Sequence, residues 1–96
     1  MKIPFSMRIG RRKYAIHEVG TVTKNMGWTL PAIALLQIAV HRLGKRRKPD
    51  DIAETFWHET THAILYEMGS PLWHNEKFVT EFSKLLAQAI RTAEFQ

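Results

Sequence analysis

Residues 49–69 read PDDIAETFWHETTHAILYEMG, and this stretch decides the fold of the second half of the chain. It opens with a proline and two aspartates, which suit a helix start because proline is tolerated in the first turn and acidic side chains stabilise the positive end of the helix dipole. Gly69 is a typical stop after the last helical turn. The pattern predicts a helix from about residue 50 to residue 68, with apolar side chains along it to bury one face.

Inside this helix stands His58-Glu59-Thr60-Thr61-His62, the pattern H-E-x-x-H. Residues four apart share a helix face, so the imidazoles of His58 and His62 can bind one zinc ion. Zinc lowers the pKa of a bound water, and a carboxylate at the position of Glu59 can take the proton as that water attacks a carbonyl. The motif therefore predicts metal ligands His58 and His62 and a catalytic base, Glu59. The alternative is a solvated helix face that carries two histidines by chance.

A catalytic zinc usually has three protein ligands and one open position. Glu76 is the expected third ligand, because it opens a second predicted helix, which runs to about residue 92 with Asn75 as its N-cap. A short connection between two antiparallel helices would bring it back to the motif. Glu76 could instead serve only the helix dipole. Glu81 and His74 are then the other candidate ligands, and His74 could also stabilise an oxyanion.

The motif followed by Asn75-Glu76 resembles the zinc-binding core of the gluzincins, the thermolysin-like clan of peptidases, in which a glutamate on a downstream helix completes the metal site. The wider pattern is similar to the very small zincin-like metallopeptidases of phages and to the ImmA/IrrE family. The resemblance covers the last half of the chain well and the first half in outline. It implies one minimal metallopeptidase domain over residues 1–96. One departure is Thr80, where larger gluzincins carry an aspartate that orients a zinc histidine.

The first half of the chain has the two-residue alternation of strands. Residues 3–9 alternate apolar and polar side chains, residues 10–12 indicate a turn, and residues 13–19 alternate again, which predicts a hairpin. Residues 20–27 are polar and bounded by glycine, so we expect a loop. Residues 32–41 are long enough for a helix, but their Ile, Leu and Val content and the resemblance favour a strand. This strand would form the rim of a cleft along which an extended peptide binds.

The expected fold is therefore α+β: a small twisted sheet, made of the N-terminal hairpin plus one further strand, packed on two main helices in a zincin-like arrangement. A chain of 96 residues has a small core, so a bound metal would add to its stability. The absence of cysteine excludes disulfides, thiolate ligands and thiol nucleophiles. The sequence has no apolar run long enough for a signal peptide or a membrane span, which predicts a soluble, cytoplasmic protein with no membrane partner.

The formal net charge is +5, much of it in residues 11–13 and 42–48. Such charge can attract nucleic acid, but neither interleaved aromatic residues nor a helix-turn-helix pattern supports a DNA-directed role, and a solvated turn is the simpler interpretation. The three tryptophans (Trp28, Trp57, Trp73) are expected wholly or partly in the core rather than along a substrate groove.

Together these features favour zinc-dependent hydrolysis of peptide bonds, with a peptide or protein as the substrate. The alternative is a non-catalytic zincin-like module that binds a protein or DNA partner. A structural zinc site is disfavoured, because such sites normally have four protein ligands and this chain offers no cysteine.

Overall fold

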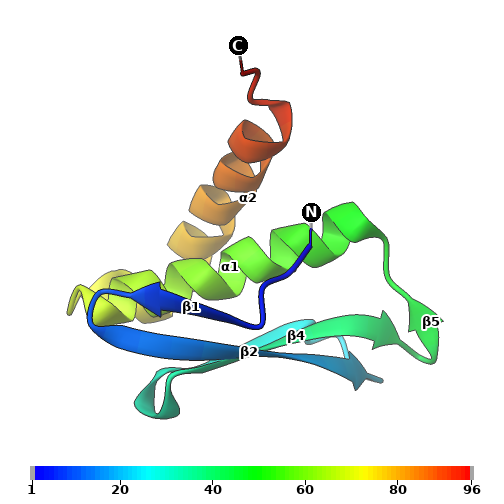
Figure 1. The fold of residues 1–96 in the computed structure, drawn as a ribbon, viewed down its shortest axis with the longest axis horizontal. Helices are drawn as coiled ribbons and strands as arrows, with labels where there is room; N and C mark the ends of the chain where they lie inside the picture. Colours follow the sequence, from blue (N-terminus) through cyan, green and yellow to red (C-terminus); the bar gives the residue numbers. More distant parts are fainter. Residues whose placement is uncertain (1, 96) are drawn as a thin grey trace.

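The computed structural model describes residues 2–95 and has an α+β architecture, which confirms the expected fold class (Figure 1). A mixed five-stranded sheet forms one layer, and α1 lies across one of its faces while α2 rises from α1 away from the sheet. The elements in chain order are β1 (Ser6–Ile9), β2 (Arg12–Thr21), β3 (Gly27–Leu30), the 3-10 turn η1 (Pro31–Ile33), β4 (Leu35–Arg42), β5 (Lys45–Arg46), α1 (Pro49–Glu67), the 3-10 turn η2 (Pro71–His74) and α2 (Glu76–Thr92).

The expected N-terminal hairpin is present as β1 and β2, which pair antiparallel with Ile9 opposite Arg12. Gly10, at φ +61°, takes the first of the two turn positions, where a tight hairpin needs a positive φ that glycine adopts without strain. β2 is longer than expected and runs on to Thr21, so the predicted loop over residues 20–27 is wrong at both ends.

The strand expected over residues 32–41 is β4, which begins at Leu35 because Pro31 and the next two residues form η1. β4 lies at the centre of the sheet, parallel to β2 on one side and antiparallel to β3 on the other. It therefore cannot be the free rim of a cleft, and that expectation is wrong. The rim strand is β3, whose four residues are too short a run to stand out by alternation.

The core lies between the sheet and α1. β2 contributes Tyr14 and Ile16, β4 contributes Leu36, Ile38 and Val40, and α1 contributes Ile52, Phe56 and Ala63. α2 adds little to this core and packs on α1 through a narrow buried stripe of small and medium side chains, Val79, Ser83 and Ala87. Both helices fall within a residue of their expected bounds. Within residues 2–95, no helix is long and apolar enough to cross a membrane.

Candidate metal centre and its cleft

Three elements bring the candidate ligands together. α1 holds His58 and His62 one turn apart, with ring centroids separated by 5.0 Å. Gly69, at φ +69°, ends the last turn of α1, and η2 then reverses the chain. The side chain of Asn75 accepts a hydrogen bond from the Phe78 amide and so caps α2, which makes Glu76 the first residue of that helix.

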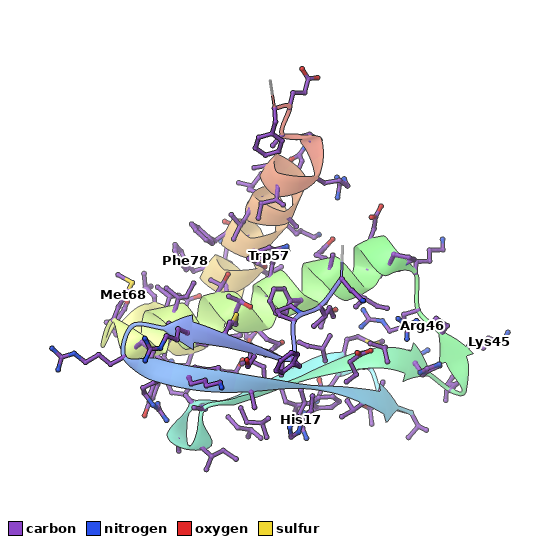
Figure 2. All side chains as sticks on the ribbon, viewed as in Figure 1. His17, Lys45, Arg46, Trp57, Met68 and Phe78 are labelled. Atoms are coloured by element: carbon purple, nitrogen blue, oxygen red, sulfur yellow. The ribbon has the colours of Figure 1, made fainter. Side chains whose placement is uncertain are left out.

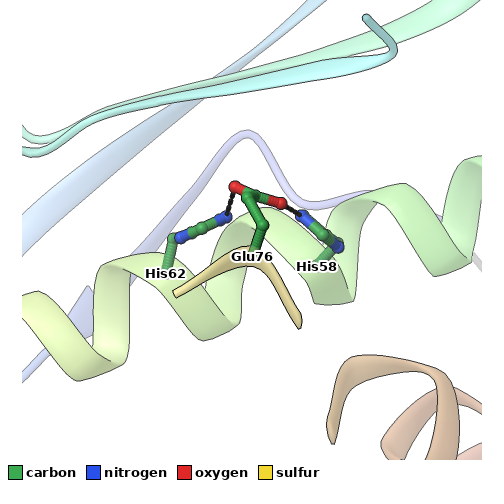
Figure 3. Close-up of side chains that lie close together, drawn as sticks. All are labelled: His58, His62 and Glu76. Atoms are coloured by element: carbon green, nitrogen blue, oxygen red, sulfur yellow. Dashed lines mark hydrogen bonds and ion pairs between the residues drawn. The ribbon is translucent and has the colours of Figure 1, made fainter. Parts of the chain in front are cut away.

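Glu76 lies between the two imidazoles (Figure 3). Its Oε2 is 3.1 Å from His58 Nε2, and its Oε1 is 2.8 Å from His62 Nε2. One ligand atom from each of the three residues lies within 4.8 Å of the others. Ligand atoms around a tetrahedral zinc, at about 2.0–2.2 Å from the ion, are roughly 3.3–3.5 Å apart. The three side chains can therefore hold one metal ion with only small side-chain adjustments.

The hydrogen bonding of His62 supports the same conclusion. Its Nδ1–H donates to the backbone carbonyl of Trp73 in η2, and since a carbonyl can only accept, the proton of a neutral ring must sit on Nδ1. The lone pair then lies on Nε2, the atom that faces a Glu76 oxygen at 2.8 Å. Two acceptors this close need a cation between them, either an added proton or a metal ion. A carbonyl that fixes the imidazole in this way is the usual outer partner of a zinc histidine.

Glu59 is buried beside this group, and β3 holds it in place. The hydroxyl of Thr29 donates to Glu59 Oε1 at 2.7 Å. Gly27 lies so close that a Cβ atom there would be 2.7 Å from Glu59 Cγ and 2.9 Å from Oε2. Burial raises the pKa of the Glu59 carboxyl above its ordinary value, while the Thr29 hydrogen bond and the two imidazoles act in the opposite direction.

An open cleft of about 590 Å³ lies above these residues. The loop before β3 and β3 itself form one wall, α1 forms the floor, and η2 with Glu76 closes one end. The cleft also contains several charged or hydrogen-bonding side chains away from the ligands, namely Lys24, Asn25, Arg47, Asp51, Glu54, Thr55 and His74. Its volume is in the range of ordinary ligand-binding clefts.

The predicted site residues His58, Glu59, His62 and Glu76 all line this cleft, and the burial of Glu59 and His62 speaks against a merely solvated helix face. Neither alternative ligand belongs to the metal-binding group found within residues 2–95. Glu81 is exposed, more than a turn further along α2, and His74 lines the cleft with its ring against Trp73.

Sequence reasoning missed three contributors to the site: the Trp73 carbonyl, Thr29 and Gly27. The first is a backbone group, which no side-chain pattern can reveal. The other two belong to β3, and only the glycine that begins the Gly-Trp-Thr-Leu segment indicated that another part of the chain comes close there. Trp28 and Trp73 are partly buried, as expected, but both also line the cleft, which was not expected.

Comparisons with protein-family models, with curated proteins and with solved structures found no match to this chain.

Proposed function

We propose that the protein is a zinc-dependent peptidase that hydrolyses peptide bonds in the cleft between β3 and α1. The observation that carries this proposal is the convergence of His58, His62 and Glu76 on one point, with the Glu59 carboxylate next to it but outside the group. Three protein ligands and an open cleft are typical of catalytic zinc sites, whereas structural sites normally have four protein ligands.

A bound zinc ion would supply two things, a water of lowered pKa and polarisation of the scissile carbonyl. The chain supplies the rest. Glu59 accepts the proton of the attacking water and returns it to the leaving amine. Thr29 holds the Glu59 carboxylate by its Oε1, and the Trp73 carbonyl holds the His62 ring, so both groups are oriented before substrate binds.

The rim strand gives the cleft a means to bind an extended peptide. β3 is the last strand of the sheet and pairs only with β4 within residues 2–95, so its other backbone edge borders the cleft. A substrate strand could add to that edge through main-chain hydrogen bonds, which would place its carbonyl groups above α1. This mode of binding favours unfolded or loop segments of proteins as substrates.

The test combines metal analysis with peptide hydrolysis. The purified protein should contain about one zinc per chain and should cleave an unstructured substrate such as a quenched-fluorescent peptide library. Glu59→Gln should keep the zinc and lose at least about 100-fold in kcat, because general base catalysis contributes about 10²–10⁴-fold. Glu54→Gln changes another carboxylate of the cleft on the same helix and should leave kcat within about twofold.

Full peptidase activity in Glu59→Gln would exclude Glu59 as the general base. A wild-type protein that binds zinc in the site but cleaves no peptide in the library would instead favour the non-catalytic binding module.

A further inference from the structure

Charge is divided unevenly between the two layers of the molecule. Residues 2–48, which form the sheet, contain eleven Lys and Arg side chains and one acidic side chain, Glu18. Residues 49–95, which form the helices, contain three basic and eight acidic side chains. The positive charge of the protein is therefore concentrated in the half of the chain that forms the sheet, and such asymmetry is typical of chains that bind polyanions.

The strand register identifies which side chains face away from the helices. Leu36 and Ile38 of β4 lie in the core against α1, so Gln37 between them points to the opposite side. His17 of β2 and Trp28 of β3 are the register partners of Gln37 and share its side. Figure 2 shows His17 on the side of the sheet away from both helices.

The same alternation places further residues on this side of the sheet. Lys13 lies on the side of His17 in β2, and Arg8 is its register partner in β1. We call the surface formed by these outward positions the outer sheet face; it comprises Arg8, Lys13, His17, Trp28, Leu30 and Gln37. Glu18 alternates to the other side, so within residues 2–95 no strand places a carboxylate on this face.

The position of Trp28 is fixed by its neighbours. Gly27 and Thr29 approach Glu59 on the inner side of β3, which turns Trp28 outward, where it is only partly buried. The outer sheet face thus combines a partly buried aromatic ring with Arg and Lys side chains, on the side of the sheet away from both helices (Figure 2). Aromatic rings on an open sheet stack on unpaired bases, and basic side chains beside them pair with phosphates.

We propose that the outer sheet face binds single-stranded nucleic acid, with Trp28 stacking on a base and Arg8 and Lys13 contacting phosphates. Four neighbouring strands give a surface roughly 15 Å wide, the scale on which open sheets hold two or three bases. A duplex fits less well, because its bases are already stacked on one another and cannot reach the Trp28 ring. Glu59 lies on the opposite side of the sheet, but Trp28 also lines the cleft, so the Glu59→Gln variant is used below to separate nucleic-acid binding from the proposed peptidase.

The experiment measures the fluorescence anisotropy of a labelled 20-nucleotide oligothymidine with the intact, zinc-loaded protein. Lys13→Glu should raise the Kd about tenfold and lower the slope of log Kd against log salt concentration by about 1. Lys84→Glu, at an exposed position on α2, changes the net charge equally and should alter the Kd less than about twofold. Trp28→Ala should weaken binding about tenfold, and Trp28→Phe should restore most of the loss.

Three results would overturn the proposal. Equal weakening by Lys13→Glu and Lys84→Glu would mean attraction by net charge alone. Tighter binding of a matched duplex, unaffected by Trp28→Ala, would exclude base stacking. Competition by polyglutamate at the same charge concentration as the oligonucleotide would indicate a site for acidic proteins. If circular dichroism shows that Lys13→Glu is unfolded, Arg8→Glu takes its place in the experiment. The Glu59→Gln variant should bind the oligothymidine as tightly as the wild type does.

Discussion

His62 uses its two ring nitrogens for different purposes. Nδ1 donates to the Trp73 carbonyl, and this bond points Nε2 at the Glu76 carboxylate. Thr80, four residues after Glu76, is exposed on α2. A backbone carbonyl in a short 3-10 turn thus provides the orientation, so no single side-chain substitution can remove it.

Gly27 is where the site tolerates no larger side chain. The Cβ of Gly27→Ala would lie 2.7 Å from Glu59 Cγ and 2.9 Å from Thr55 Cγ2, so the buried Glu59 side chain must move. We expect this variant to lose at least about tenfold in kcat, with zinc content unchanged because the metal ligands are untouched. Steady-state kinetics and metal analysis on one sample check this, and Gly20→Ala, with only a 3.9 Å contact to the His41 Cβ, is the control. Equal kcat in both variants would show that Glu59 is not the group that Gly27 positions.

Thr60 carries a buried hydroxyl that has no hydrogen-bond partner among the described residues. Thr60→Val replaces that hydroxyl with a methyl group of similar size and should raise the free energy of unfolding by about 1 kcal/mol. Thr61→Val is the matched control one residue along α1, because the Thr61 hydroxyl donates to the Trp57 carbonyl at 2.7 Å. Urea denaturation should show no gain for Thr61→Val. A loss of stability in Thr60→Val would mean that the hydroxyl has a partner after all.

α1 is held on the sheet by polar contacts as well as by the packing of its apolar side chains. The hydroxyl of Tyr14 in β2 donates to Glu67 Oε2 at 2.7 Å, and Arg12 reaches the same oxygen at 2.9 Å. Glu67 is the last residue of α1, so this contact anchors the end of the helix from which η2 departs.

Loss of the Tyr14 hydroxyl should weaken this anchor. Tyr14→Phe is expected to lower the free energy of unfolding by about 1.5–2 kcal/mol, because the acceptor is charged and partly buried. A double-mutant cycle with Glu67→Ala measures the coupling, and simple additivity of the two losses would contradict a direct interaction.

The same tyrosine predicts how stability depends on pH. Burial first, and then the hydrogen bond to Glu67, raise the pKa of Tyr14 well above its usual value. The neutral form is therefore favoured in the folded state, and its contribution is fully present below pH about 10, where the unfolded tyrosine begins to ionise. As the pH rises further, the free energy of unfolding should fall. Denaturation experiments across this pH range should show that the free energy of unfolding falls less steeply with pH for Tyr14→Phe than for the wild type.

The sequence predicts the elements that carry strong local signals. The two helices, with their caps, and the hairpin at Gly10 follow from patterns of ten residues or more or from a turn residue. β3 and β5 escaped prediction because they have four and two residues, and β4 could not be placed between β2 and β3 because pairing over such distances has no local signature. The spacing of His58, Glu59 and His62 was readable for the same local reason, whereas Glu76 needed the turn of η2 to reach them.

On the scale of the whole molecule, the candidate metal site links α1 to the beginning of α2. α2 is held on α1 by the stripe of Val79, Ser83 and Ala87, and Glu76 at its start is the ligand that comes from outside α1. A metal bound by all three ligands would therefore fasten α2 to the rest of the protein, and its binding energy would add to the stability of the fold.

Removal of zinc should consequently lower the melting temperature. Free zinc at about 100 times its Kd adds about 2.7 kcal/mol, which for a domain of this size corresponds to roughly 10–20 °C. Scanning calorimetry with and without a chelator measures the shift. Glu76→Gln should abolish most of it, and Glu81→Gln should leave it intact. A shift that survives Glu76→Gln would place the third ligand elsewhere.

The strand order has a consequence for how the proposed catalytic site is assembled. β4 follows β3 in sequence, yet it separates β3 from β2, and it is the strand on which β3 docks. Gly27 and Thr29 reach Glu59 only when β3 is paired with β4 and α1 is packed against the sheet. The proposed catalytic site is therefore complete only when the sheet layer and the helix layer have joined, so its assembly reports on the docking of the two layers.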